Sequence, residues 1–224
     1  MNRIKDFQLF MFDFDCLLVN TENLHYEAYR SMCAARGVNF TWDFPQYCSY
    51  AHYEAAGFRE SMFVDFPALK ASEPDWEILY SEKKAALMEL VHQGKIDLMP
   101  GVEQLLQELK THHVKRCVVT HSPKALIEAI REQHPVLNTI AHWITREHYA
   151  NPKPDPECYL TAIEKFSKPG DNIIGFEDTP RGLKALMGTE ATPVIVCQVD
   201  YPELPEFIRK GATHLRTLED WSRA

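Results

Sequence analysis

Two patterns of hydrophobic residues alternate along most of this chain, and together they predict alternating strands and helices. Apolar residues recur at helical spacing in several segments, for example Leu24, Ala28 and Met32. Short, nearly continuous apolar runs separate these segments and predict strands near 8–12, 115–120, 140–144, 172–176, 194–197 and 213–215. Because strands that alternate with helices form a parallel sheet covered on both faces, the chain is predicted to have an α/β fold.

Capping residues indicate where several of the predicted helices begin and end. Thr21 is the predicted N-cap of a helix that runs to about residue 36, and Gly37 can end it in the left-handed conformation. Ser122 and Thr179 can cap two later helices, and each is followed by a proline, which suits a first helical position.

The segment 38–72 has a different character, since it is rich in aromatic residues and holds only short amphipathic pieces. A long helix is predicted after it, over about 75–92. We therefore expect two domains: an α/β core formed by 1–17 and 96–224, and an inserted helical cap formed by 18–95. The aromatic residues suit contact with a sugar or nucleotide, although such residues more often form a core.

Composition narrows the classes of function. The chain has 224 residues, 45% hydrophobic and 25% charged, and a net charge of −8, which is typical of a soluble globular protein and gives no sign of a surface for nucleic acid or membrane. The six cysteines form no C-x-x-C pair and are expected to be reduced thiols. Since no N-terminal signal is visible, the expected location is the cytoplasm.

Polar side chains follow the predicted strands at the points where the strands end. Asp13 and Asp15 come directly after the first strand, and residues two apart point to the same side, so their carboxylates meet at one strand tip. Such a pair suits Mg²⁺, which takes one or two carboxylates together with phosphate oxygens. Later strands are followed by Thr120, Lys153 and the pair Glu177-Asp178. Ligands of parallel sheets bind beyond these carboxyl ends, so the residues predict a site for Mg²⁺ and a phosphoryl group.

The order of these motifs resembles the four motifs of the haloacid dehalogenase superfamily. The longer stretches that carry the resemblance are Asp13-Phe-Asp-Cys-Leu-Leu-Val-Asn-Thr-Glu22, Val118-Val-Thr-His-Ser122, Lys153-Pro-Asp-Pro-Glu157 and Phe176-Glu-Asp-Thr-Pro-Arg-Gly182. The resemblance covers nearly the whole chain. It implies a Rossmann-like parallel core and a helical cap between the first two motifs, as in the subfamily of small phosphatases and β-phosphoglucomutase.

The resemblance also implies roles for the carboxylates. Asp13 would attack phosphorus and form an aspartyl-phosphate, and Asp15 would act as acid and then as base. Asp13, Asp15 through its backbone carbonyl, and Asp178 would bind Mg²⁺, with Glu177 supporting these ligands from behind.

The remaining implied roles concern the phosphoryl group and the substrate. Thr120, the N–H of His121 and Lys153 would bind the phosphoryl oxygens, and His25 would be a substrate contact or a surface residue. Cys16 replaces a usual glycine at a position expected to tolerate change, and Asn20 replaces a usual aspartate. His121 replaces a common asparagine, and its imidazole is expected to alter the pH dependence of activity.

These observations favour the hypothesis that the protein is a Mg²⁺-dependent phosphatase of small phosphate monoesters such as sugar phosphates. A phosphomutase of the β-phosphoglucomutase type is the first alternative, and a non-catalytic regulatory or binding protein on the same fold is the second. The expected partner is a small phosphorylated substrate, and the expected state is a monomer or weak dimer.

Overall fold

The computed structural model describes residues 3–52, 55–94 and 96–223 and divides the chain into two compact units. One unit is formed by Met1–Asn20 and Asp97–Ala224, here called the α/β unit, and the other by Thr21–Ile96, here called the helical unit. Lys95, the last residue of the predicted cap, lies outside the described residues. That the helical unit serves as a cap stays a prediction.

Within the described residues, the α/β unit contains a six-stranded sheet in the order β3-β2-β1-β4-β5-β6, and every neighbouring pair is parallel. The strands are β1 (Leu9–Phe12), β2 (Lys115–Val119), β3 (His142–Ile144), β4 (Ile173–Glu177), β5 (Thr192–Val196) and β6 (Thr213–Leu215). The predicted α/β class is therefore confirmed, and all six predicted strands are present within a few residues of their expected bounds.

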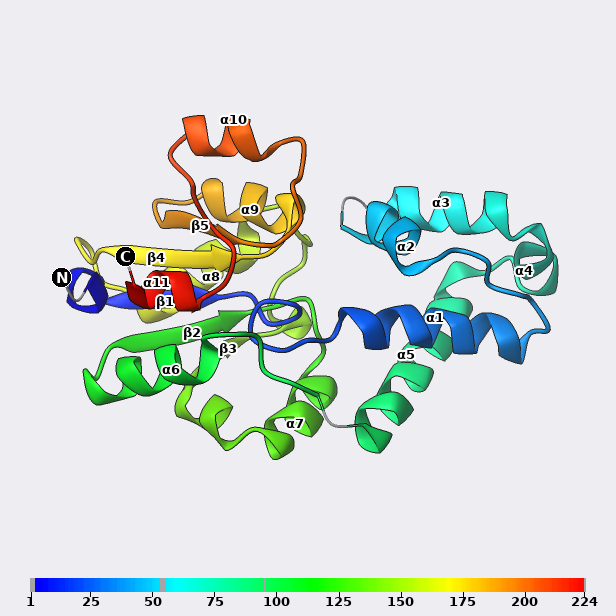
Figure 1. Ribbon diagram of the computed structural model, residues 1–224, viewed down its shortest axis with the longest axis horizontal. Coiled ribbons are helices and arrows are strands. Elements are labelled where there is room, and N and C mark those ends of the chain that lie inside the picture. Colours follow the sequence, from blue (N-terminus) through cyan, green and yellow to red (C-terminus); the bar gives the residue numbers. More distant parts are fainter. Residues whose placement is uncertain (1–2, 53–54, 95, 224) are drawn as a thin grey trace. The chain divides into compact units, whose positions relative to one another are not determined.

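Helices cover both faces of this sheet (Figure 1). Because crossovers between parallel strands are right-handed, the strand order puts α6 and α7 on one face and α8, α9 and α10 on the other. The helices are α6 (Val102–Thr111), α7 (Lys124–Gln133), α8 (Glu157–Phe166), α9 (Pro180–Met187), α10 (Leu204–Arg209) and α11 (Glu219–Arg223). Short 3₁₀ helices are η1 (Arg3–Asp6), η2 (Pro135–Thr139) and η3 (Arg146–His148).

The central strand β1 is buried along its whole length and sets the position of the first motif. Phe10 and Phe12 stack with Phe176 of β4 at centroid distances of 6.0 and 5.1 Å, and Trp221 packs edge-on against Phe176 at 5.3 Å. In this register Phe12 pairs with both Val118 and Phe176. The chain therefore leaves β1, β2 and β4 at the same edge of the sheet, which is where the motif residues begin.

Two predicted N-caps have different outcomes. Thr179 caps α9 as expected, since its hydroxyl accepts a hydrogen bond from the Gly182 N–H at 3.2 Å. Ser122 does not cap α7, because the cap position belongs to Pro123, and the Ser122 hydroxyl binds Asp15 instead. A serine before Pro-Lys has the sequence of a cap, and only the tertiary structure shows that its hydroxyl meets Asp15.

The helical unit contains α1 (Glu22–Ala35), α2 (Phe44–Ala51), α3 (Ala55–Asp65), α4 (Pro67–Ser72) and α5 (Trp76–Gln93). Helices α1 and α5 pack against each other, and Figure 1 shows α5 running obliquely to α1. The aromatic residues of segment 38–72 form the core of this unit together with Tyr29 and Met32, since Phe40, Trp42, Tyr47, Phe58 and Phe66 are all buried. These five aromatics therefore pack as a core and are not available as a binding surface for a sugar or nucleotide.

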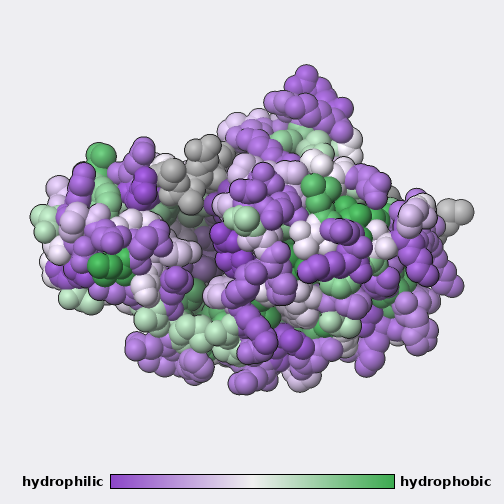
Figure 2. All heavy atoms as spheres, turned by 180° about the vertical axis from the view of Figure 1, so that it is seen from behind, coloured by the Kyte–Doolittle hydropathy of each residue, from purple (hydrophilic) through white to green (hydrophobic). Residues whose placement is uncertain are grey.

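Hydrophilic residues occupy most of the face shown in Figure 2, with hydrophobic residues scattered among them. Among the helices that the structure describes, none combines the length and the apolar composition needed to span a bilayer.

Candidate active site

The first motif lies in a tight loop that follows β1. The Asp13 N–H continues the sheet by donating to the Phe176 carbonyl at 3.0 Å, and the chain then turns back through a hydrogen bond from Cys16 N to Val19 O at 2.8 Å. Cys16 has a φ of 61°, in the left-handed region that glycine occupies without strain. The expectation that this position tolerates change therefore stays a prediction, and the left-handed φ explains why glycine would fit here with less strain.

Lys153 is buried between two carboxylates. Its Nζ lies 2.6 Å from Asp13 Oδ1, 2.6 Å from Glu177 Oε1 and 3.1 Å from the Val119 carbonyl oxygen. Burial by itself would lower the pKa of this lysine, but the two carboxylates outweigh it, and the pKa is raised well above its ordinary value. Lys153 therefore remains a fixed positive charge beside Asp13.

The Asp13 carboxyl is in an unfavourable environment as long as no further cation is bound. Burial, opposed by the Lys153 charge and reinforced by the charges of Glu177 and Asp15, raises the pKa of Asp13 from 3.8 to about 7. The carboxylate oxygens of Asp13, Glu177 and Asp178 lie within 4.8 Å of one another. One lysine cannot balance three carboxylates, so the arrangement suits a divalent cation with a preference for oxygen ligands.

Glu177 is held by its own set of neighbours. Its Oε1 accepts hydrogen bonds from Lys153 and from the Tyr159 hydroxyl, and the side chain is 1% exposed. A Cβ on Gly182, in the first turn of α9, would lie 1.9 Å from Glu177 Oε2, so a larger residue at this position would displace the Glu177 carboxylate from its hydrogen bonds. The supporting role of Glu177 stays a prediction, and its carboxylate also lies among the possible metal ligands.

Asp15 faces the residues that follow β2. Its Oδ2 accepts a hydrogen bond from the Ser122 hydroxyl at 2.5 Å and a longer one from the Thr120 hydroxyl at 3.4 Å. Thr120 Oγ1 in turn accepts from the Ser122 N–H at 2.9 Å. The sequence interpretation missed Ser122 as a site residue, and the available signal was its place two residues after Thr120 at the end of the strand.

His121 supports the Lys153 loop. Its Nε2 accepts a hydrogen bond from the Lys153 backbone N–H at 2.9 Å, so the ring is the neutral tautomer with its proton on Nδ1. Burial, with the nearby charges of Lys153 and Arg181, lowers the pKa of His121 to about 2. The ring is therefore neutral in this structure, and the expectation that it alters the pH dependence of activity stays a prediction.

His25 lies in the helical unit, on α1. Its Nδ1 is 2.6 Å from Nζ of Lys83 on α5, and Lys83 is buried with its ammonium 4.9 Å from the centre of the Tyr29 ring. His25 is thus not an isolated surface residue. Its contact with substrate stays a prediction.

The chain is similar in sequence to several curated proteins. The chain is 26% identical over 181 residues to Protein CbbY of Cereibacter sphaeroides, covering 80% of this chain and 79% of that protein. It is 28% identical over 181 residues to the phosphorylated carbohydrates phosphatase of Thermotoga maritima, covering 78% of each.

Solved structures share the fold. CbbY from Rhodobacter sphaeroides in complex with phosphate superposes with a TM-score of 0.75 at 23% identity, covering 93% of both chains. The β-phosphoglucomutase from Clostridium difficile gives 0.70 at 21% identity, covering 96% of this chain and 92% of that one. The profile of the haloacid dehalogenase-like hydrolases matches residues 10–196. This match spans all four motifs and most of the chain, and the protein is therefore a member of the haloacid dehalogenase-like hydrolase family.

Proposed function

We propose that this protein hydrolyses small phosphate monoesters, such as sugar phosphates, with Mg²⁺ and through an aspartyl-phosphate on Asp13. The observation that carries the proposal is the buried Asp13 carboxylate with Lys153 Nζ 2.6 Å from its Oδ1 and two further carboxylates within 4.8 Å. The names of relatives that act on phosphorylated carbohydrates and glycerol 3-phosphate support the substrate class.

The oxygen donors at this edge fit Mg²⁺. Asp13, Asp178 and the backbone carbonyl of Asp15 would hold the ion, and when bound it would neutralise charge on the phosphoryl oxygens. Lys153 supplies a further fixed positive charge at the nucleophile, so that two cations together offset the repulsion between the carboxylate and the incoming phosphate. Such preorganised charges do not have to reorient during the reaction, which is where most of their effect on rate arises.

Asp13 is the proposed nucleophile. One of its carboxylate oxygens attacks phosphorus, the ester oxygen departs, and an acyl-phosphate bond forms on the side chain. In a second step a water molecule attacks that phosphorus, which releases inorganic phosphate and restores the carboxylate. Thr120 and the N–H of His121 are placed after β2 at the same edge of the sheet and would bind the equatorial oxygens.

Asp15 is the proposed acid and base. In its acid form it gives its proton to the departing ester oxygen, and as a carboxylate it then takes a proton from the attacking water. Ser122 and Thr120 both bind its Oδ2, which fixes the plane of the carboxyl group. We therefore infer that Ser122 is a positioning residue for this proton transfer.

Phosphate release tests the proposal directly. A panel of sugar phosphates, nucleotides and an aryl phosphate is assayed with Mg²⁺, with EDTA, and with Asp13→Asn. The exposed carboxylate Glu164 on α8 provides a matched control, since Glu164→Gln makes the same carboxylate-to-amide change away from the site. Release that needs Mg²⁺ and Asp13 but not Glu164 supports the proposal, and release that survives Asp13→Asn contradicts it.

The choice of leaving group separates the role of Asp15 from that of Asp13. Asp15→Asn should slow the hydrolysis of a sugar phosphate by about a hundredfold or more, because an alkoxide needs a proton to leave. An aryl phosphate has a better leaving group, so its first step should be slowed much less. If a bisphosphate accumulated in place of inorganic phosphate, the enzyme would be a mutase and hydrolysis would not be its main reaction.

A further inference from the structure

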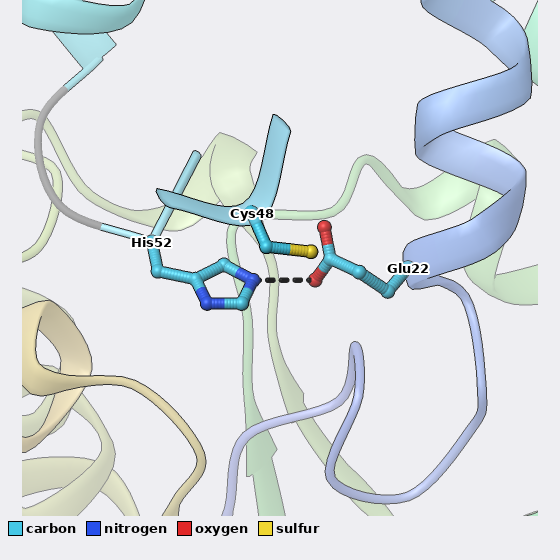
Figure 3. Close-up of side chains that lie close together, drawn as sticks. All are labelled: Glu22, Cys48 and His52. Atoms are coloured by element: carbon cyan, nitrogen blue, oxygen red, sulfur yellow. Dashed lines mark ion pairs between the residues drawn. The ribbon is translucent and has the colours of Figure 1, made fainter. Parts of the chain in front are cut away.

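Three side chains of types that can bind a metal ion meet in the helical unit. Glu22 is the first residue of α1, Cys48 lies on α2, and His52 directly follows α2. Figure 3 shows the carboxylate, thiol and imidazole pointing toward one another. Their ligand atoms all lie within 4.8 Å of one another, and the proposed phosphatase chemistry uses none of them.

Local structure presents two of these side chains together. Cys48 and His52 are four residues apart, a spacing that places side chains on one face of a helix, and the His52 N–H donates to the Cys48 carbonyl at 3.3 Å. The helix has a defined start, because Asp43 accepts a hydrogen bond from the Gln46 N–H at 2.8 Å. Tyr47 anchors the same helix in the aromatic core.

The distances suit tetrahedral coordination. Zn–N and Zn–O bonds of about 2.0–2.2 Å at a tetrahedral angle put the two ligand atoms roughly 3.3 Å apart. Glu22 Oε2 and His52 Nε2 are 3.1 Å apart, with side chains 20% and 12% exposed. The sulfur of Cys48 needs to lie about 3.6 Å from each and lies within 4.8 Å of both, so each distance has to shorten by up to about 1.2 Å when the metal binds.

We propose that Glu22, Cys48 and His52 form a binding site for Zn²⁺ or a similar borderline divalent cation. A thiolate with an imidazole selects such ions, whereas Mg²⁺ prefers the all-oxygen set around Asp13. Three protein ligands leave one tetrahedral position for water or an exogenous ligand. Metal binding ties the first residue of α1 to the end of α2.

Binding exchanges a proton for the metal. Like an ordinary cysteine, the metal-free thiol of Cys48 is protonated near neutrality. On binding, the S–H bond breaks, the sulfur keeps the electron pair and forms the metal bond, and the proton passes to solvent. No oxidant or reductant is involved.

Cobalt(II) is a suitable probe, because a Co²⁺–thiolate bond gives a charge-transfer band that oxygen and nitrogen ligands do not. The full chain is titrated with CoCl₂ in excess MgCl₂, which occupies oxygen-only sites. We expect the band at one equivalent per chain, its loss in Cys48→Ala, and its retention in Cys33→Ala, which removes a buried thiol of the same unit that is not among the three ligands.

Competition with ZnCl₂ then measures affinity. We expect Zn²⁺ to displace Co²⁺, and His52→Gln to weaken binding by at least about tenfold while His92→Gln, on exposed α5 surface, leaves it unchanged. Circular dichroism confirms that each variant is folded. Absence of the band in the wild-type chain overturns the proposal, as does a band that persists in folded Cys48→Ala or that is lost equally in Cys33→Ala.

Discussion

Replacing Asp13 with asparagine should stabilise the metal-free protein relative to wild type, and this gain in the free energy of unfolding should increase as the pH rises. The same change removes the proposed nucleophile. The amide keeps an oxygen that can accept the hydrogen bond from Lys153, and it removes a carboxyl whose pKa burial holds at about 7 against an ordinary 3.8. The folded wild-type chain therefore keeps a proton on this group that the unfolded chain has already released.

The sign and size of the effect follow from that difference. Below about pH 4 both states carry the proton and this group adds no pH dependence, while between pH 4 and 7 the wild-type protein loses up to about 1.4 kcal/mol of stability per pH unit. Above about pH 7 both states are ionised and the full penalty of about 4 kcal/mol applies. Asp13→Asn carries no such penalty.

Urea unfolding in EDTA, at pH values from about 5 to about 8, measures the difference between the two proteins. The stability of Asp13→Asn relative to wild type should increase with pH and level off above pH 7. Glu164→Gln should follow wild type throughout. A difference that is flat with pH, or that decreases as pH rises, would refute the assignment of Asp13 as a buried and electrostatically strained carboxylate.

Three further substitutions test individual contacts. Gly182→Ala places a methyl group 1.9 Å from the Glu177 carboxylate and should lower both Tm and phosphate release. In the control Gly57→Ala the new Cβ meets no neighbouring atom within 4 Å, and the change should stabilise its helix by up to about 1 kcal/mol. Equal effects of the two substitutions would contradict the close contact at Gly182. Lys153→Met leaves the buried carboxylates without their cation, so it should lower the free energy of unfolding by about 3–5 kcal/mol and abolish phosphate release. A variant as stable in urea as the wild-type protein would contradict this role of Lys153. Cys16→Gly relieves the left-handed strain and should raise stability by about 1 kcal/mol in urea, and a loss of stability would refute that account.

Much of the α/β unit could be predicted because its signals are local. Buried strands such as 173–177 appear as apolar runs, and the parallel sheet brings the residues after them to one edge. This is why Asp13 and Lys153, which are 140 residues apart, could be placed in one site before their 2.6 Å contact was known. The phosphate and metal roles assigned to these residues stay predictions.

Other parts of the site depend on side-chain packing between distant segments, which no local pattern reports. Ser122 has the sequence of a helix cap, but its hydroxyl donates a hydrogen bond to the Asp15 carboxylate, which lies 107 residues away in the sequence. Tyr159 has the spacing of a core residue on its helix, and only the tertiary structure brings its hydroxyl to Glu177. The neutral state of His121 results from burial that depends on neighbours far along the chain.

The position of β1 in the middle of the sheet affects the order in which the parts of the protein fold during synthesis. The first strand to leave the ribosome, β1, pairs with β2 and β4, which are both synthesised later. Gln8 can pair with Asn172 only after another 164 residues have been added. At ordinary rates of synthesis that delay is roughly 10 to 30 s. The helical unit, which is continuous from 21 to 96, can complete its core during this interval. The apolar strand that carries Asp13 therefore remains unpaired on one side while most of the chain is translated, so chaperone binding to residues 9–12 is expected to protect the nascent enzyme.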